Sequence, residues 1–468
     1  MSFAHFNPAT LNLDFQFELW KTEREVLRVR DTRRAKLHLP KGEVNEMLGR
    51  IFTEASVAKG ESDTSSWLEA YTAHQRYSES PTSFHFWTGV SAIAGALRRK
   101  VWIDQRHFQW TPNMYIVLVG PAGVVAKSTS IRPGLEMLRE VKGVSFGPQS
   151  MTWQALIQSF KKAEKPLTIG TKTEKISCIC VGVSELGTFL DPADRILVDF
   201  LTDMWDGQKG PWTRFIKGEG EITLESPWIN LIACTTPSWL KSNFPEDLVG
   251  GGLTSRIVFV YADQKFQLIS YPSEEIEEEA YEIEKMALIN DLKQIGELQG
   301  EYKITKDALE WGDSWYQHYQ NGGLPAHLAS PRFEGYVARK QTHVHKLAMV
   351  LAASKRNDLF ITINDLKEAE AHISALETDM MQVFSSIGVS QQAKVTSEVI
   401  TIIKNHPSGI AWQDLWKLCI RTMKQQDFME SLKGAVDANQ VKKVPIPGFV
   451  NAEGKPNNYM LTYTGGRR

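Results

Sequence analysis

The sequence has no long hydrophobic run, few cysteines and no excess of charge of either sign. No apolar stretch is long enough to cross a bilayer and no signal peptide or lipidation signature is found, so we expect no membrane partner. Three of the four cysteines (Cys178, Cys180 and Cys234) fall in predicted strands, which indicates reduced core residues of a cytoplasmic protein. The 53 basic and 55 acidic residues nearly balance, so any DNA contact must be a local patch.

One stretch stands out against this ordinary background. Residues 115–129 read YIVLVGPAGVVAKST, a solid apolar run followed by a glycine turn and the start of a helix. A buried parallel strand that ends in such a turn presents backbone N–H groups, and the following helix adds the positive end of its dipole. The pattern predicts a phosphate-binding loop. The alternative is a glycine-rich turn before an ordinary helix.

The loop residues expected to bind ATP are Gly120, Pro121, Ala122, Gly123, Val124, Val125, Ala126, Lys127, Ser128 and Thr129. The Lys127 ammonium would reach the terminal phosphates, and the Ser128 hydroxyl would hold a Mg²⁺ ion that bridges them. Two features depart from the usual pattern. Lys127 follows Gly120 by seven positions where six are usual, and Ala126 replaces a glycine. The alanine methyl costs little unless that position needs a positive φ.

Two further apolar strands are predicted to end in polar residues. Residues 176–183 lead into Ser184 and Glu185, and residues 228–234 lead into Thr235 and Thr236. We expect Glu185 to act as general base or to orient the attacking water, and Ser184 to make at most a weak, water-mediated metal contact. A plain cap or solvated turn is the alternative for Glu185. Thr235 and Thr236 are candidate sensors of the water and the γ-phosphate.

Basic residues supply the remaining candidates of the core. Residues 250–256, GGGLTSR, end in Arg256 before the predicted strand 257–261, and we expect an arginine finger that acts on a neighbouring subunit. An intramolecular salt bridge is the alternative. Residues 212–224 predict a hairpin, with Arg214 and Lys217 near its tip as candidate DNA contacts. An ordinary hairpin with exposed charges would explain the same pattern.

Four segments occur in a characteristic order: GPAGVVAKST, VGVSELGTFL, LIACTTPSWL and GGLTSRIVFVY. Together they resemble the AAA+ type ATPase domain of phage- and mobile-element-encoded replicative helicases and primase-helicases, over about residues 67–385. The resemblance implies an ATP- and Mg²⁺-dependent ring, usually hexameric, that translocates on single-stranded DNA and opens forked DNA. Such a ring works alone or with other replication proteins, in a bacterial host cytoplasm if phage-encoded. By motif position it gives Lys127, Ser128, Glu185, Thr235 or Thr236, and Arg256 the roles above.

The resemblance also marks Arg339, near the start of the predicted helix 333–354, as the lid arginine that senses the γ-phosphate. A surface arginine is the alternative. No zinc-ribbon or acidic primase signature is present, so the sequence does not support primase activity.

The last part of the chain predicts three helices and a two-stranded wing, the elements of a winged helix. Its candidate phosphate contacts are Lys424, Lys433, Lys442, Lys443 and Lys455. Winged helices also dock on proteins, so DNA and protein both remain as partners of this domain.

We therefore expect an α/β P-loop NTPase core with a parallel sheet (residues 67–270), preceded by an N-terminal arm and helical region (1–66) and followed by a helical lid (271–390) and a winged-helix domain (391–468). Three functions fit this architecture. The first is an ATP-driven ring helicase. The second is a nucleotide-dependent DNA-binding switch or helicase loader without unwinding activity, and the third is a structural subunit with a degenerate loop.

Overall fold

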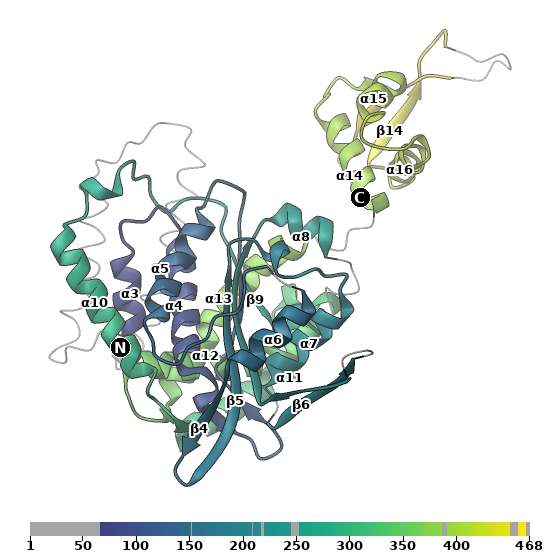
Figure 1. Ribbon diagram of the computed structural model, residues 1–468. Helices are drawn as coiled ribbons and strands as arrows, with labels where there is room; N and C mark the ends of the chain where they lie inside the picture. The colour runs from purple at the N-terminus through teal and green to yellow at the C-terminus, as the bar shows by residue number, and fades with distance from the viewer. Residues whose placement is uncertain are drawn as a thin grey trace, which may run out of the picture. The chain divides into compact units, whose positions relative to one another are not determined.

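The computed structural model of the chain describes residues 66–150, 152–207, 209–216, 220–244, 252–385, 391–449 and 457–464. It is a mixed α/β structure that divides into two compact units between Phe384 and Ser385 (Figure 1). The arm and the helices expected before residue 66 lie outside the described residues. None of the helices in the described ranges combines the length and the apolar character that crossing a bilayer requires.

A five-stranded sheet forms the centre of the first unit. Its order is β4 (Glu164–Ile169), β5 (Lys172–Val183), β8 (Pro227–Thr235), β3 (Tyr115–Val119) and β9 (Ile257–Tyr261). The last four strands are parallel, and only β4 runs antiparallel, as a hairpin with β5. The carboxyl ends of β3, β5 and β8 therefore meet at one edge of the sheet, which we call the carboxyl edge, and the start of β9 lies at the opposite, amino edge.

The central strands β3 and β8 have apolar sequences and are buried on both faces of the sheet. Every residue of β3 and β8 is buried, as expected for parallel strands covered by helices. Figure 1 shows α4 (Thr82–Leu97) and α5 (Lys127–Arg139) on one face and α6 (Trp153–Lys162) and α7 (Arg195–Asp206) on the other. A Cβ at Gly182 would lie 2.3 Å from a methyl of Leu135, so this glycine lets α5 approach β5 closely.

Two further helices pack outside α4. Ser66 caps α3 (Trp67–His74) in a reciprocal capping box with Glu69, and the Trp67 indole donates to the backbone oxygen of Leu288 in α10 (Glu278–Ile295). The first unit also contains several short elements: β1 (Val101–Asp104), β2 (Gln109–Trp110), β10 (Gly300–Glu301), the hairpin of β6 (Pro211–Ile216) and β7 (Gly220–Glu225), and α8 (Pro237–Asn243).

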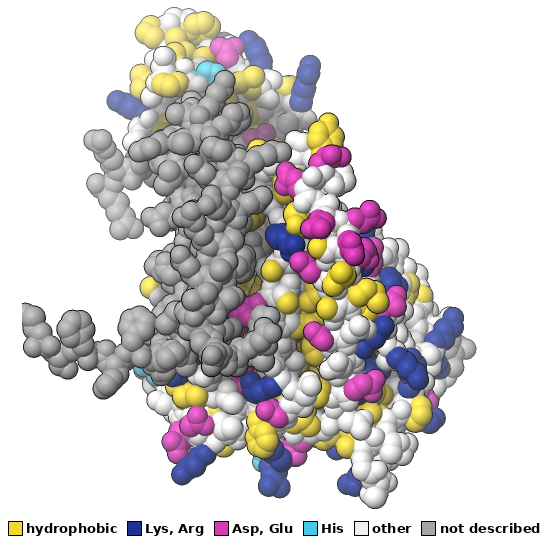
Figure 2. All heavy atoms as spheres, turned by 90° about the vertical axis from the view of Figure 1, so that its left-hand side faces the viewer, with side chains coloured by type: hydrophobic (Ala, Val, Ile, Leu, Met, Phe, Trp, Pro, Cys, Tyr) yellow, Lys and Arg dark blue, Asp and Glu magenta, His cyan; other side chains and the backbone are white. Residues whose placement is uncertain are grey.

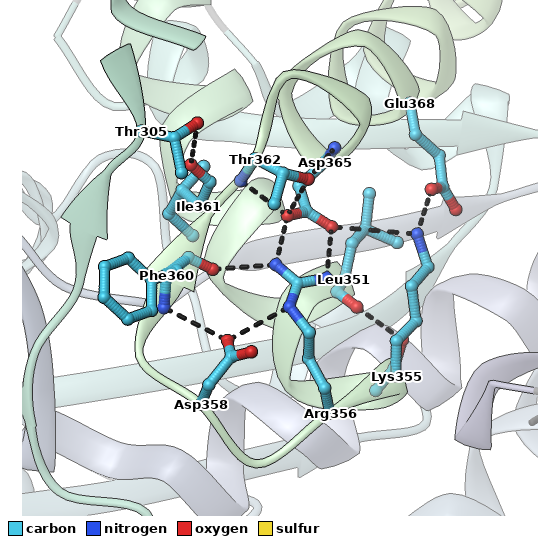
Figure 3. A network of polar contacts seen from close by, with 11 residues as sticks. Thr305, Leu351, Lys355, Arg356, Asp358, Phe360, Ile361, Thr362, Asp365 and Glu368 are labelled. Carbon is cyan, nitrogen blue, oxygen red and sulfur yellow. Dashed lines mark hydrogen bonds and ion pairs between the residues drawn. The ribbon is translucent and has the colours of Figure 1, made fainter. Parts of the chain in front are cut away.

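The unit ends in three long helices, α11 (Lys306–Gln320), α12 (Glu334–Lys355) and α13 (Ile363–Ser385). A polar network holds the corner between α12 and α13 (Figure 3): the buried Asp365 carboxylate accepts from Arg356 and from the N–H and hydroxyl of Thr362. Lys355 pairs with Glu368 beside it. In the same corner β12 (Phe360–Ile361) pairs with β11 (Lys303–Ile304), which fixes the start of α11 to the corner.

The second unit contains α14 (Gln391–Lys404), α15 (Trp412–Cys419) and α16 (Gln425–Asp437), with a sheet in the order β13 (Ile410–Ala411), β15 (Tyr459–Tyr463) and β14 (Val441–Pro445). Its separate core includes Val399, Leu415, Phe428, Leu432 and Leu461. Each helix thus contributes one apolar face to a core that a small domain can bury.

Candidate functional site

The loop between β3 and α5 begins at a glycine that no other residue can replace without a shift. A Cβ at Gly120 would lie 2.4 Å from the backbone oxygen of Ala262 and 2.6 Å from a methyl of Val125. The Gly120 N–H donates to the backbone oxygen of Thr235 at 3.3 Å. The loop is therefore anchored on both sides, to the ends of β8 and β9.

Ala126 ends the loop in the left-handed region, with φ 46° and ψ 40°, directly before α5. This is the position where the usual pattern has glycine, and the structure shows that the position does need a positive φ. An alanine there costs about 1 kcal/mol of backbone strain. Residues held in such conformations cluster at functional sites, because the surrounding structure must impose them.

Lys127, the first residue of α5, folds its side chain back over the loop. Its Nζ donates to the backbone oxygens of Gly120 at 2.7 Å and Pro121 at 2.9 Å. Partial burial lowers the pKa of Lys127, and the nearby Glu185 carboxylate opposes that shift. The ammonium therefore lies on the inner side of the loop, within the electrostatic field of Glu185. The loop residues Ala122, Gly123, Val124, Ser128 and Thr129 are exposed, whereas Val125 is buried.

Glu185 and Thr235 meet beside the loop. Thr235 ends β8, its side chain is buried, and its hydroxyl donates to Glu185 Oε1 at 3.4 Å. Burial raises the pKa of the neighbouring Cys234 thiol to about 12, with Lys127 and Glu185 acting on it in opposite directions. Lys127 follows β3, Glu185 follows β5 and Thr235 is the last residue of β8. Because β8 lies between β5 and β3, the sheet brings these three residues together.

The other two residues expected here have different surroundings. The Thr236 hydroxyl accepts from the N–H of Trp239 at 3.1 Å and so caps α8, which leaves Thr235 as the sensor candidate. Ser184 is exposed after β5. Among the described residues no group of three or more His, Cys, Asp or Glu side chains could hold a metal ion. A Mg²⁺ ion could bind here through the exposed Ser128 hydroxyl together with the phosphates of its nucleotide, which suits its preference for substrate oxygens and water.

A short segment outside the motifs supports the loop. The buried Ser80 hydroxyl donates to the backbone oxygen of Ala126 at 3.1 Å. Next to it, Glu79 binds the segment that follows β9: its carboxylate pairs with Lys265 at 2.5 Å and accepts from the N–H of Ile269 at 3.1 Å. No sequence motif marks these residues, because their partners lie 46 to 190 positions away.

An anion bound at this edge would therefore meet a loop that opens a helix, a lysine, and a carboxylate with a hydroxyl beside it. Comparison of the chain with known protein families and with curated proteins finds no match. Function is therefore inferred from the chain's own residues. Backbone N–H groups with a lysine bind phosphate, and a carboxylate next to them can accept a proton from water.

Arg256 lies elsewhere. It directly precedes β9, at the amino edge, whereas Lys127 follows the carboxyl end of β3, the strand beside β9. Its side chain is only 6% exposed, and its guanidinium pairs with Asp206 at 2.6 Å and donates to the backbone oxygen of Gly252 at 2.6 Å. A finger must extend from the surface into the neighbouring subunit. The structure shows the intramolecular salt bridge that was the alternative, and a finger role for Arg256 on a neighbouring subunit stays a prediction.

Arg339 also lies at the amino edge. It donates to the backbone oxygen of Gly335 at 3.2 Å, and its pKa is lowered by partial burial and by Arg256, while Asp206 opposes the shift. These neighbours place Arg339 with the Arg256 pair and not with the loop of the same chain. Its role as the γ-phosphate sensor stays a prediction.

The predicted hairpin forms as β6 and β7, at the amino edge. Arg214 lies over the Trp153 ring, 5.4 Å from its centre, and Lys217 falls outside the described residues. Phe215, next to the tip, is 76% exposed, an aromatic residue that the sequence analysis did not single out. In the second unit Lys424, Lys433, Lys442 and Lys443 are all exposed, and the Lys443 Nζ lies 3.9 Å from the centre of the Tyr459 ring. Lys455 falls outside the described residues.

Proposed function

We propose that the chain is a P-loop ATPase that binds Mg·ATP at the carboxyl edge of its sheet. The observation that supports this most is the meeting of Lys127, Glu185 and Thr235 beside a loop that opens a helix. A glycine turn with lysine alone would fit many proteins. A carboxylate and a hydroxyl from two other strand ends add the groups that hydrolysis needs.

In the proposed reaction the loop N–H groups and Lys127 bind the β- and γ-phosphates and stabilise charge on the transferred phosphoryl group. Glu185 orients a water molecule and accepts its proton as the water oxygen bonds to phosphorus. The bond between the γ-phosphorus and the bridging oxygen then breaks, and ADP leaves. Thr235 holds Glu185 in place through its hydroxyl. A Mg²⁺ ion bound with the nucleotide at Ser128 would neutralise phosphate charge.

We further propose that the core is AAA+ like, that α11 to α13 form its helical lid and that the second unit is a winged helix. On this basis ATP hydrolysis drives a ring, hexameric by the resemblance, along DNA. Two surfaces support a DNA partner: the β6–β7 hairpin with Arg214 and the exposed Phe215, and the wing strand β14 with Lys442 and Lys443. Exposed aromatic and basic side chains are the groups that hold single strands.

A nucleotide-dependent DNA-binding switch or loader is the second candidate, and Arg256 favours it. Its side chain is buried and paired with Asp206 in the same chain, so coupling to a neighbouring subunit through Arg256 would require that pair to break. The charge of α16 points the same way, because this helix carries Lys433 against Asp427, Glu430 and Asp437. A helix with net negative charge is repelled by DNA phosphates and is poorly suited to bind in the major groove. In this unit we therefore expect the wing strand β14 to contact DNA.

Two assays on the full chain test these functions. ATP hydrolysis that is lost in Lys127→Ala and Glu185→Gln would support the ATPase, and absence of ATP binding would leave only the structural subunit. Strand displacement on forked DNA then separates the remaining two. Unwinding that needs both residues supports the helicase, whereas hydrolysis without unwinding leaves only the switch.

A further inference from the structure

The outer face of α10 carries exposed apolar side chains that no described residue covers. Ile283 is 63% exposed and Met286 is 51% exposed, one turn apart on the same face. Leu268 and Tyr271, in the segment before the helix, are exposed as well. The opposite face, with Leu288 and the other buried residues of α10, packs on the body of the unit.

Acidic side chains surround this apolar face. Residues 274–284 contain seven glutamates and no basic residue. Glu284 pairs with Arg76 and Glu282 with Lys285, whereas Glu278 and Glu279 have no ion pair with any described residue. Figure 2, which faces the side where α10 lies in Figure 1, shows acidic and hydrophobic side chains next to one another. A partner for this face therefore needs apolar side chains together with positive charge.

The same chain contains such a segment before Ser66. Residues 19–36 carry the apolar side chains Leu19, Trp20, Val26, Leu27 and Val29. Within residues 28–36 there are five basic residues (Arg28, Arg30, Arg33, Arg34 and Lys36) and one acidic residue, Asp31. This is the charge complement of the α10 face.

The chain also enters the described structure at the right place. Ser66 caps α3, and α3 is hydrogen-bonded to α10 through Trp67 and Leu288. Ser66 lies thirty positions after residue 36, and a chain of that length spans up to about 100 Å when extended. The α10 helix is only about 27 Å long. A segment tethered this close has a high effective concentration at the α10 face.

We propose that residues 19–36 dock on the outer face of α10 in the same chain. Their apolar side chains cover Ile283 and Met286, and their arginines lie against Glu278, Glu279 and Glu282. The surface needs no bound nucleotide, so this inference is independent of the proposed function.

A photoreactive benzophenone side chain at position 286 of the full chain tests the proposal. Irradiation should give a cross-linked peptide that contains residues from 19–36, in protein that keeps the mass of one chain. The same group at position 309, an exposed residue of α11, is the control and should not capture this segment. Absence of the peptide from the position-286 sample, or its appearance only in protein of twice the mass, would overturn the proposal.

Charge reversal sharpens the test. Arg28→Glu with Arg30→Glu should lower the cross-link yield about threefold or more, because exposed ion pairs become repulsive contacts. Adding Glu279→Arg and Glu282→Arg should restore the yield. Adding Glu310→Arg and Asp313→Arg on α11 instead should not. Equal yields in all these proteins would mean that charge does not guide the segment, and the proposal would be wrong.

Discussion

The two edges of the central sheet use charged residues in opposite ways. At the carboxyl edge, Lys127 and Glu185 are partly exposed, and Lys127 donates only to backbone oxygens of its own loop. At the amino edge, the buried Arg256 is paired with Asp206, and the fully buried Lys346 donates to Asn113 and to the backbone oxygen of Trp205. Charges of the first edge remain accessible to a ligand, whereas charges of the second are part of the packing. Sequence alone does not distinguish these two uses of a lysine or an arginine.

The largest effect is expected at the carboxyl edge. Lys127→Ala should lower the rate of ATP hydrolysis by about 10² to 10³-fold, because one preorganised charge next to the γ-phosphate is lost. The thermal midpoint should change little, since the side chain makes no buried ion pair. Lys306→Ala is the control, because that side chain is 92% exposed on α11. A purified Lys127→Ala protein with unchanged hydrolysis would remove the proposed site.

At the amino edge the same kind of substitution should affect folding. Asp206→Ala leaves the Arg256 guanidinium buried without its carboxylate and should lower the free energy of unfolding by about 3 kcal/mol. Arg256→Ala should cost less, about 1 to 2 kcal/mol, because the Asp206 side chain is 41% exposed and water can solvate it. Urea denaturation measures both. An Arg256→Ala protein of normal stability that has lost ATP hydrolysis would instead support the arginine finger.

Acid should also weaken the amino edge. Burial, with Lys346, Arg339 and Arg256 nearby, lowers the pKa of His343 to about 4, and its Nε2–H donates to the backbone oxygen of Ser255 when the ring is neutral. The unfolded chain therefore binds the proton first, and stability falls as the pH drops from about 6.5 towards 4. His343 alone should account for roughly 2 kcal/mol between pH 7.5 and pH 5.

His343→Gln checks this contribution. The variant should show a smaller loss of unfolding free energy between pH 7.5 and pH 5, although His85, His345 and His372 are also buried with lowered pKa values and keep part of the effect. His318→Gln on the exposed side of α11 is the control and should change nothing. Identical pH profiles for all three proteins would mean that His343 is solvated in the folded chain.

The smallest effect is expected at Ala126. Ala126→Gly should raise the free energy of unfolding by up to about 1 kcal/mol, because glycine removes the strain of the left-handed conformation. The greater freedom of glycine in the unfolded chain cancels only part of this gain. Ala122→Gly, in the same loop without a positive φ, should be neutral or slightly destabilising. Thermal denaturation of the pair compares them directly.

Apolar runs explain why the sheet could be predicted. The strands expected at residues 176–183, 228–234 and 257–261 are confirmed, as is the helix start after the loop. The edge strand β4 was not predicted, because EKPLTI is polar, contains proline and faces solvent along most of its length. The helix α6 is capped by Thr152, whose hydroxyl accepts from the N–H of Ala155.

Some site residues could be predicted from their position after an apolar strand, and others could not. Glu185 and Thr235 could be expected beside Lys127, because each follows a buried strand and parallel strands end at one edge. The partners of Arg256 and Arg339 could not, since burial of an arginine depends on a carboxylate such as Asp206, 50 positions away in the chain. The supporting residues Glu79 and Ser80 carry no motif and are recognisable only by their contacts.

Gly120 packs directly against the backbone of Ala262, so we expect the loop and the end of β9 to move together. The loop has no room to shift towards Ala262, so a displacement of the loop in that direction has to push the residues that follow β9. Those residues are hydrogen-bonded to Glu79, and the adjacent Ser80 is hydrogen-bonded to Ala126 in the loop. That strand extension leads on to Leu268, Tyr271 and α10. We therefore expect a displacement of the loop between β3 and α5 to be transmitted through backbone packing to a surface far along the sequence.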